Sequence, residues 1–139
     1  MLASSGCGAS APPLSQQVRT WARSTSLASD ISTVRGDLVH EASLPLAPGA
    51  ALRTVCDVLV TDALDANEQL PTPDATLTTL LSRAYTEAAA AGHDCFNGAG
   101  GNTTDLDRSV GARQAAERDL VVAQARYDSL ISALPTATS

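Results

Sequence analysis

Apolar side chains recur at steps of three and four residues along most of this 139-residue chain, which is the spacing of one face of an α-helix. Such faces run through residues 14–42, 52–70, 77–91 and 112–134. No stretch alternates between apolar and polar residues for long enough to predict a β-strand. The pattern therefore predicts an all-α protein. Four amphipathic helices joined by short connections favour an up-down-up-down four-helix bundle.

Prolines and glycines mark two of the helix boundaries. The segment 44–49 contains two prolines and a glycine, which cannot continue the hydrogen-bond ladder of a helix. At the next boundary, Thr72 is predicted to be the N-cap of the third helix, with Pro73 as its first residue. Asp74 then lies in the first turn, where a negative charge stabilises the helix dipole.

The remaining helix ends are predicted from glycines and from one capping pattern. Gly92 is a favourable C-terminal stop for the third helix. The glycine-rich residues 97–102 are expected to form a loop. Thr104 followed by Asp107 resembles a capping box, which would open the fourth helix.

Composition and charge narrow the class of protein. Hydrophobic residues make up 44% of the chain but aromatic residues only 3%, so the core must consist mainly of Leu, Val and Ala. The net charge is −6, which argues against a nucleic-acid partner, because contacts to phosphates need clustered cations. No apolar run is long enough to predict a membrane-spanning helix.

The first residues contain a cysteine in a suggestive context. Cys7 follows Ser5-Gly6 and precedes small residues and prolines over 8–13. This N-terminus resembles that of bacterial lipoproteins, in which the cysteine after the cleavage point receives acyl chains. The resemblance implies export and lipidation at Cys7, with the apolar leader expected upstream of Met1. An ordinary terminus with an incidental cysteine is the alternative.

The implied organisation has three parts. They are a lipobox-like terminus and tether at residues 1–13, the helical bundle at 14–134 and a disordered tail at 135–139. All nine cationic residues are Arg, and alanine is abundant, which indicates a GC-rich genome. An actinobacterial or actinobacteriophage source is therefore expected.

Two further cysteines are predicted to form a disulfide. Cys56 lies early in the second helix, and Cys95 follows the expected end of the third. In a hairpin of these two helices the chain after Gly92 would have to fold back by roughly 10 Å to reach Cys56, which a three-residue excursion can cover. Two reduced cysteines in the core are the alternative.

Candidate chemistry is sparse. The sequence His93-Asp94-Cys95 is the one dense cluster of metal-ligand side chains, but contiguous residues rarely face one ion, and no CxxC or HExxH pattern accompanies them. The glycines of 98–101 lack the Lys and Ser/Thr that complete a phosphate-binding loop. We therefore predict no catalytic residue, no metal site and no cofactor.

The leading functional hypothesis is a non-enzymatic lipoprotein of the cell envelope, which lies outside the cytoplasm and binds a protein partner. The first and fourth predicted helices are the longest, so we expect their ends to project and to leave apolar side chains uncovered for that partner. These residues are Leu14, Val18, Leu130, Ile131 and Leu134. A helical carrier of a small apolar ligand and a phage-type exclusion lipoprotein are the alternatives.

Overall fold

A computed structural model describes residues 10–133 and confirms the all-α prediction, with five helices and no strand in that range. The helices are α1 (Leu14–Ser24), α2 (Leu27–Ser43), α3 (Ala50–Glu68), α4 (Ala75–Ala99) and α5 (Thr103–Ser132). The structure therefore has one helix more than the four-helix prediction.

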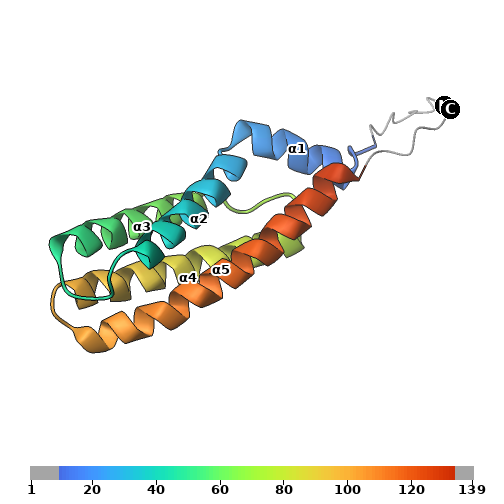
Figure 1. The fold of residues 1–139 in the computed structure, drawn as a ribbon. Helices are drawn as coiled ribbons and strands as arrows, with labels where there is room; N and C mark the ends of the chain where they lie inside the picture. The colour runs from blue at the N-terminus through green and yellow to red at the C-terminus, as the bar shows by residue number, and fades with distance from the viewer. Residues whose placement is uncertain (1–9, 134–139) are drawn as a thin grey trace, which may run out of the picture.

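Figure 1 shows an elongated molecule in which α2 to α5 run alternately in opposite directions. The helix α4 packs along both α3 and α5, while α2 packs on α3 and also contacts α5. The helix α1 lies against the C-terminal end of α5, where the Arg19 guanidinium donates a hydrogen bond to the Ile131 carbonyl. That carbonyl belongs to the last turn of α5, whose C=O groups lack partners within the helix, so the bond fixes α1 in place.

The core consists of aliphatic residues, as the composition predicts. One cluster occupies most of the bundle, and many of its members have no exposed surface. These include Val18, Val34, Leu38, Leu59, Ala63, Leu77, Leu81, Ala84, Ala88, Ala91, Ala116 and Ala123. Because alanine presents only a methyl group, the helices can approach closely along this core.

The predicted first helix is interrupted between Ser24 and Leu27, and this is why the structure has five helices. The backbone is extended at Thr25, and the Trp21 carbonyl accepts hydrogen bonds from the hydroxyls of Ser24 and Thr25. Serine and threonine side chains compete in this way for the groups that would otherwise continue a helix. The apolar period continues across the break, so periodicity alone could not reveal it.

The start of α4 differs from the prediction by two residues. The N-cap is Asp74 rather than Thr72, and its carboxylate accepts a hydrogen bond of 2.8 Å from the Leu77 N–H. Pro73 therefore precedes the helix and is not its first residue. Thr72 is buried, and its hydroxyl donates to the Asp74 carbonyl, so it supports the cap instead of forming it.

The predicted end of α4 at Gly92 is too early. The helix passes through Gly92 and ends at Ala99, and the loop predicted for 97–102 shrinks to three residues. The N-cap of α5 is Asn102, whose side chain accepts from the Asp105 N–H, so the capping box of Thr104 and Asp107 is wrong.

Gly92 has a packing role in the middle of α4. A Cβ atom there would lie 2.6 Å from Val60 Cγ2 and 3.0 Å from the Cys56 carbonyl oxygen, both of α3. Those distances are shorter than atoms of neighbouring helices can tolerate. The glycine therefore permits the close approach of α3 and α4, which outweighs its poor helix propensity.

Alanine substitutions at two helical glycines are expected to change stability in opposite directions. Gly92→Ala should lower the free energy of unfolding by about 1–3 kcal/mol, because α3 and α4 must move apart. Gly36→Ala should raise it by about 0.5–1 kcal/mol, because nothing lies within 4 Å of the added methyl group and alanine favours the helix. Urea unfolding of both variants checks this, and changes of the same sign would contradict the packing argument.

Candidate functional site

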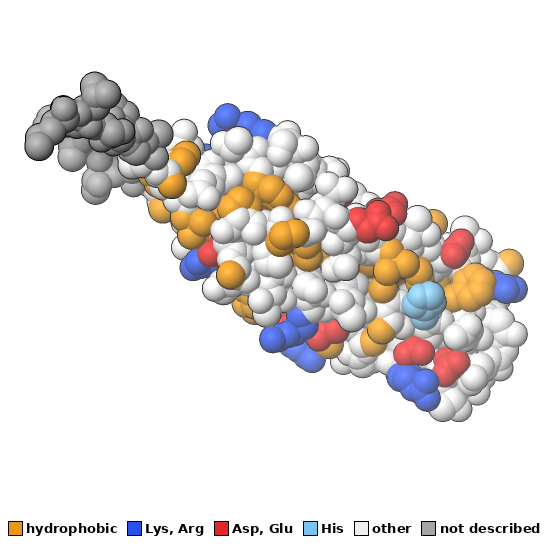
Figure 2. Space-filling model, turned by 180° about the vertical axis from the view of Figure 1, so that it is seen from behind, with side chains coloured by type: hydrophobic (Ala, Val, Ile, Leu, Met, Phe, Trp, Pro, Cys, Tyr) orange, Lys and Arg blue, Asp and Glu red, His pale blue; other side chains and the backbone are white. Residues whose placement is uncertain are grey.

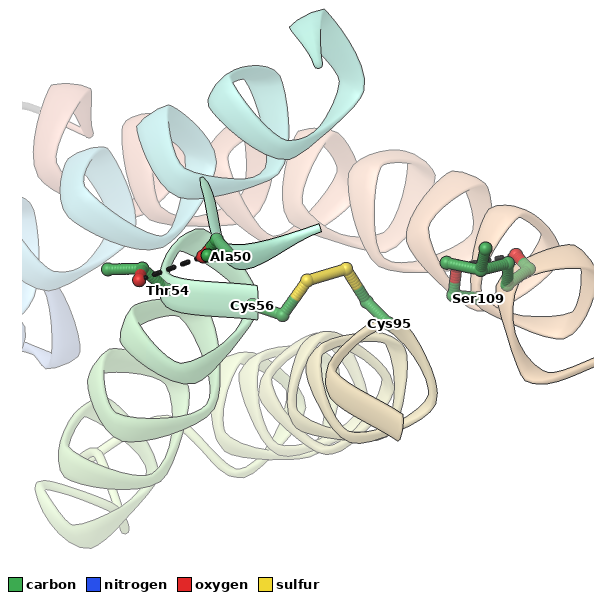
Figure 3. The surroundings of a disulfide bond; sticks show 6 residues. Ala50, Thr54, Cys56, Cys95 and Ser109 are labelled. Atoms are coloured by element: carbon green, nitrogen blue, oxygen red, sulfur yellow. Dashed lines mark hydrogen bonds between the residues drawn. A yellow bond between two sulfur atoms is a disulfide. The ribbon is translucent and has the colours of Figure 1, made fainter. Parts of the chain in front are cut away.

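Cys56 of α3 and Cys95 of α4 face each other across the helix pair, with their Cα atoms 5.6 Å apart and their sulfur atoms joined (Figure 3). The two cysteines predicted to pair therefore lie at disulfide distance, but the predicted route is wrong. No chain folds back after Gly92, because Cys95 lies within α4 itself. Both cysteines are fully buried.

The disulfide belongs to a small second cluster that is separate from the main core. Its buried apolar members are Leu52, Ala99 and Leu106, from α3, α4 and α5. Leu44 and Phe96 pack against the cluster from outside and remain partly exposed. This cluster closes the end of the bundle where α2 connects to α3 and α4 connects to α5 (Figure 1).

The segment 44–49 forms an apolar rim at this end of the molecule. Its residues other than Leu46, together with Ala51 and Leu52, line a surface cavity of about 200 Å³. Leu46 within the segment is 47% exposed. In Figure 2, hydrophobic side chains are visible at this end, beside both positive and negative charges.

A second depression adjoins the rim on the α3 side. It has a volume of about 320 Å³, and Phe96 and Arg53 are among the residues that line it. The Arg53 guanidinium carbon lies 4.4 Å from the centre of the Phe96 ring, which is a cation–π arrangement. We call the rim 44–49 with Arg53 and Phe96 the loop-end surface.

The loop-end surface was not predicted, because the prolines and glycine of residues 44–49 indicate only the end of a helix. The available signal was the alternation Leu-Pro-Leu-Ala-Pro, which is unusually apolar for a turn. Phe96, the single phenylalanine of the chain, was a further signal. A partly exposed aromatic ring beside an arginine is typical of contact surfaces.

The residues that the sequence analysis selected for partner binding do not form one open surface. Val18 and Leu130 are buried in the main core, so the expectation that these ends remain uncovered is wrong for both. Leu14 is 38% exposed, and Ile131 is partly buried against the same core. Cys7 and Leu134 lie outside the described residues.

The cluster His93-Asp94-Cys95 is split by the helix. His93 is exposed, Cys95 is bonded to Cys56, and Asp94 Oδ1 lies 3.9 Å from an Arg108 nitrogen. Within residues 10–133, no group of three or more His, Cys, Asp or Glu side chains is arranged to hold a metal ion.

Several carboxyl groups lie against other acidic groups at helix contacts. Burial, followed by a hydrogen bond to Asp62 of α3, raises the pKa of Asp37 in α2 to about 7. Burial, followed by a hydrogen bond to Asp119 of α5, likewise raises the pKa of Glu87 in α4 to about 7. In each pair, protonation of one carboxyl would allow it to donate to the other, which favours the protonated form and is one cause of the raised pKa.

Glu41 of α2 is the most buried of these acids, with 4% of its surface exposed. Its burial raises its pKa to about 7, although Arg113 of α5 lowers the value and Glu117 raises it again. Neither Glu41 Oε2 nor Arg113 Nε has a hydrogen-bond partner among the described residues. A buried polar atom without a partner is costly, so this contact between α2 and α5 is only partly satisfied.

None of the described helices combines the length and apolarity needed to cross a membrane. The chain matches no protein-family model, no curated protein and no solved structure.

Proposed function

We propose that this chain is a non-enzymatic module of the bacterial cell envelope that is tethered through a lipid on Cys7 and binds a protein partner through its loop-end surface. The observation that carries the proposal is the exposed apolar rim 44–49, which lies beside Phe96 and over a buried disulfide. A surface with apolar centre and charged edge is typical of protein contacts.

The position of the rim suits a tethered protein. The described chain begins near α1, at the end of the molecule opposite the rim (Figure 1). Seven residues from Cys7 bring the chain to Leu14, the first residue of α1, so an anchor at Cys7 would hold the α1 end near the membrane and leave the loop-end surface free to face away from it. The tether alone spans up to about 23 Å, since an extended residue covers about 3.3 Å.

The disulfide supports an extracytoplasmic location. Structural disulfides persist in oxidising compartments and are rare in the cytosol. In this chain the bond joins helices directly beneath the rim, where few other apolar residues are available to hold the surface in shape. Two acyl chains on Cys7 would give stable anchoring, because each buried methylene contributes about 0.8 kcal/mol.

The proposal is tested by purifying the full-length gene product, with its own leader, from host membranes and identifying the protein that accompanies it. Leu46→Asp should reduce recovery of that partner at least tenfold, because a charge would enter the apolar rim. Leu64→Asp is the matched control, since Leu64 is 48% exposed on α3 outside the rim. Equal loss or equal retention in the two variants would contradict the assigned surface.

Anchoring is tested in the same preparation with Cys7→Ala. This variant should leave the membrane fraction or accumulate as an unprocessed precursor. If its fractionation matches that of the wild type, the lipoprotein interpretation fails while the partner surface can still stand.

The hypothesis of an apolar-ligand carrier gains no support from the cavities described above, which are surface depressions. An exclusion lipoprotein would use the same anchor and a protein partner, and is therefore a special case of this proposal.

A further inference from the structure

The helix α2 carries three carboxyl groups on the side that faces the bundle. Asp30, Asp37 and Glu41 each have one buried oxygen without a hydrogen-bond partner in the described part of the chain. They flank the stripe of Leu27, Ile31, Val34 and Leu38, which anchors α2 in the main core. This helix is therefore held by an apolar stripe bordered by unsatisfied acids.

The groups that face these carboxyls are mostly acidic as well. From α3, Asp62 faces Asp37, and both Asp62 and Asp65 approach Asp30. From α4, the buried phenol of Tyr85 interacts with Asp30. From α5, Glu41 meets Glu117 and the cation Arg113.

Ionisation of these carboxyl groups would destabilise the packing of α2 on its neighbours. Two neighbouring carboxylates repel each other and leave buried acceptor oxygens without donors, whereas one protonated carboxyl supplies the missing donor. The other contacts of α2 compensate less for this repulsion than those of its neighbours would. The helices α3 and α4 are joined by the disulfide, and α4 packs extensively on α5.

We propose that α2 is a proton-responsive element, which packs firmly on α3 and α5 when its inward carboxyl groups are protonated and loosens when they ionise. The connecting segment 44–49 follows α2 directly, so loosening of α2 would also disorder the loop-end surface. Only this last consequence rests on the proposed function. The response of α2 itself does not.

The direction of the effect follows from proton binding. At pH 6 the packed Asp37 and Glu41 retain protons that the same residues release in a loosened segment, where their pKa values return towards 3.8 and 4.5. Raising the pH through 7 removes this preference for the packed state. Each of the two carboxyls should then increase the opening constant of α2 by about tenfold between pH 6 and pH 8.

Hydrogen–deuterium exchange of the full chain at pH 6 and pH 8 tests the proposal, after correction for the intrinsic pH dependence of exchange. Peptides from α2 should lose at least tenfold in protection at pH 8. Peptides from α4 around Cys95 should change much less. Equal changes in α2 and α4, or none in α2, would overturn the proposal.

Neutral substitutions identify the groups responsible. Asp37→Asn with Glu41→Gln should keep α2 protected at pH 8 and flatten its response to pH. Glu87→Gln is the control, because it removes the acidic pair between α4 and α5 and should leave the response of α2 intact. A full response in the double variant, or its loss in Glu87→Gln, would assign the effect to other groups and refute the proposal for α2. A loss of partner binding without any change in the exchange protection of α2 would instead count against the proposed function alone.

Discussion

Replacing both Cys56 and Cys95 with alanine is expected to lower the free energy of unfolding by about 4 kcal/mol. The bond closes a segment of 39 residues, and the chain-entropy estimate for a loop of that length is about 4 kcal/mol at 25 °C. For a domain of this size the loss corresponds to a fall in the melting temperature of roughly 12–20 °C. The double variant avoids leaving one buried thiol without its partner.

Thermal unfolding with and without reductant measures this effect. The reduced wild type should melt close to the double variant, and Cys7→Ser should melt like the oxidised wild type. Thiol titration of the denatured, unreduced protein should detect no thiol besides that of Cys7. A fall in melting temperature below about 4 °C would show that the bond contributes little.

The disulfide matters more at this end of the molecule than it would in the main core. The cluster around it contains only three other buried apolar residues, Leu52, Ala99 and Leu106. Such a cluster buries too little apolar surface to fix three helix ends by itself. The covalent bond therefore keeps α3 and α4 in register beneath the rim 44–49, on which the proposed partner contact depends.

The pairing of Cys56 with Cys95 was predictable, but its geometry was not. In the predicted hairpin of the second and third helices, Cys56 would lie level with a residue before Gly92. In the structure the connection comprises residues 69–74 and lets α4 begin beyond the end of α3. From Cys56 to the end of α3 is about 18 Å and from the start of α4 to Cys95 about 30 Å, and the connection spans the difference.

Helix type and core composition followed directly from periodicity, because the same apolar stripes that repeat in the sequence are buried in the structure. The break at Thr25 depends on side-chain hydrogen bonds to one carbonyl, which no apolar period records. The role of Gly92 and the pairing of Asp37 with Asp62 depend on which helices contact each other and on their relative positions along the bundle axis. Both are tertiary properties that a single helix face cannot reveal.

Asp74→Ala is expected to be the second most damaging substitution, because one carboxylate serves two purposes. It caps α4 through the Leu77 N–H, and it accepts hydrogen bonds of 2.9 Å from both Nε and Nη2 of Arg126 in α5. The Asp74 side chain is only 7% exposed. Loss of the cap and of a buried charge-assisted acceptor should lower the free energy of unfolding by about 2–3 kcal/mol.

Asp74 and the α2 carboxyl groups contribute to the free energy of unfolding with different pH dependences, so their contributions can be separated. The hydrogen bonds from Arg126, more than the one from Leu77, hold the pKa of Asp74 below its ordinary value of 3.8. The carboxylate therefore contributes its full stability above that value and loses it as the pH falls through the lower folded pKa. The stability gap between wild type and Asp74→Ala should be constant from pH 5 to pH 8 and shrink below about pH 4.

Asp74→Asn is the control, because it keeps the capping oxygen. Its loss of stability should be smaller and confined to the contact with Arg126. Urea unfolding at several pH values measures all three proteins, and a gap for Asp74→Ala that stayed unchanged at pH 2 would disprove the role of the carboxylate charge.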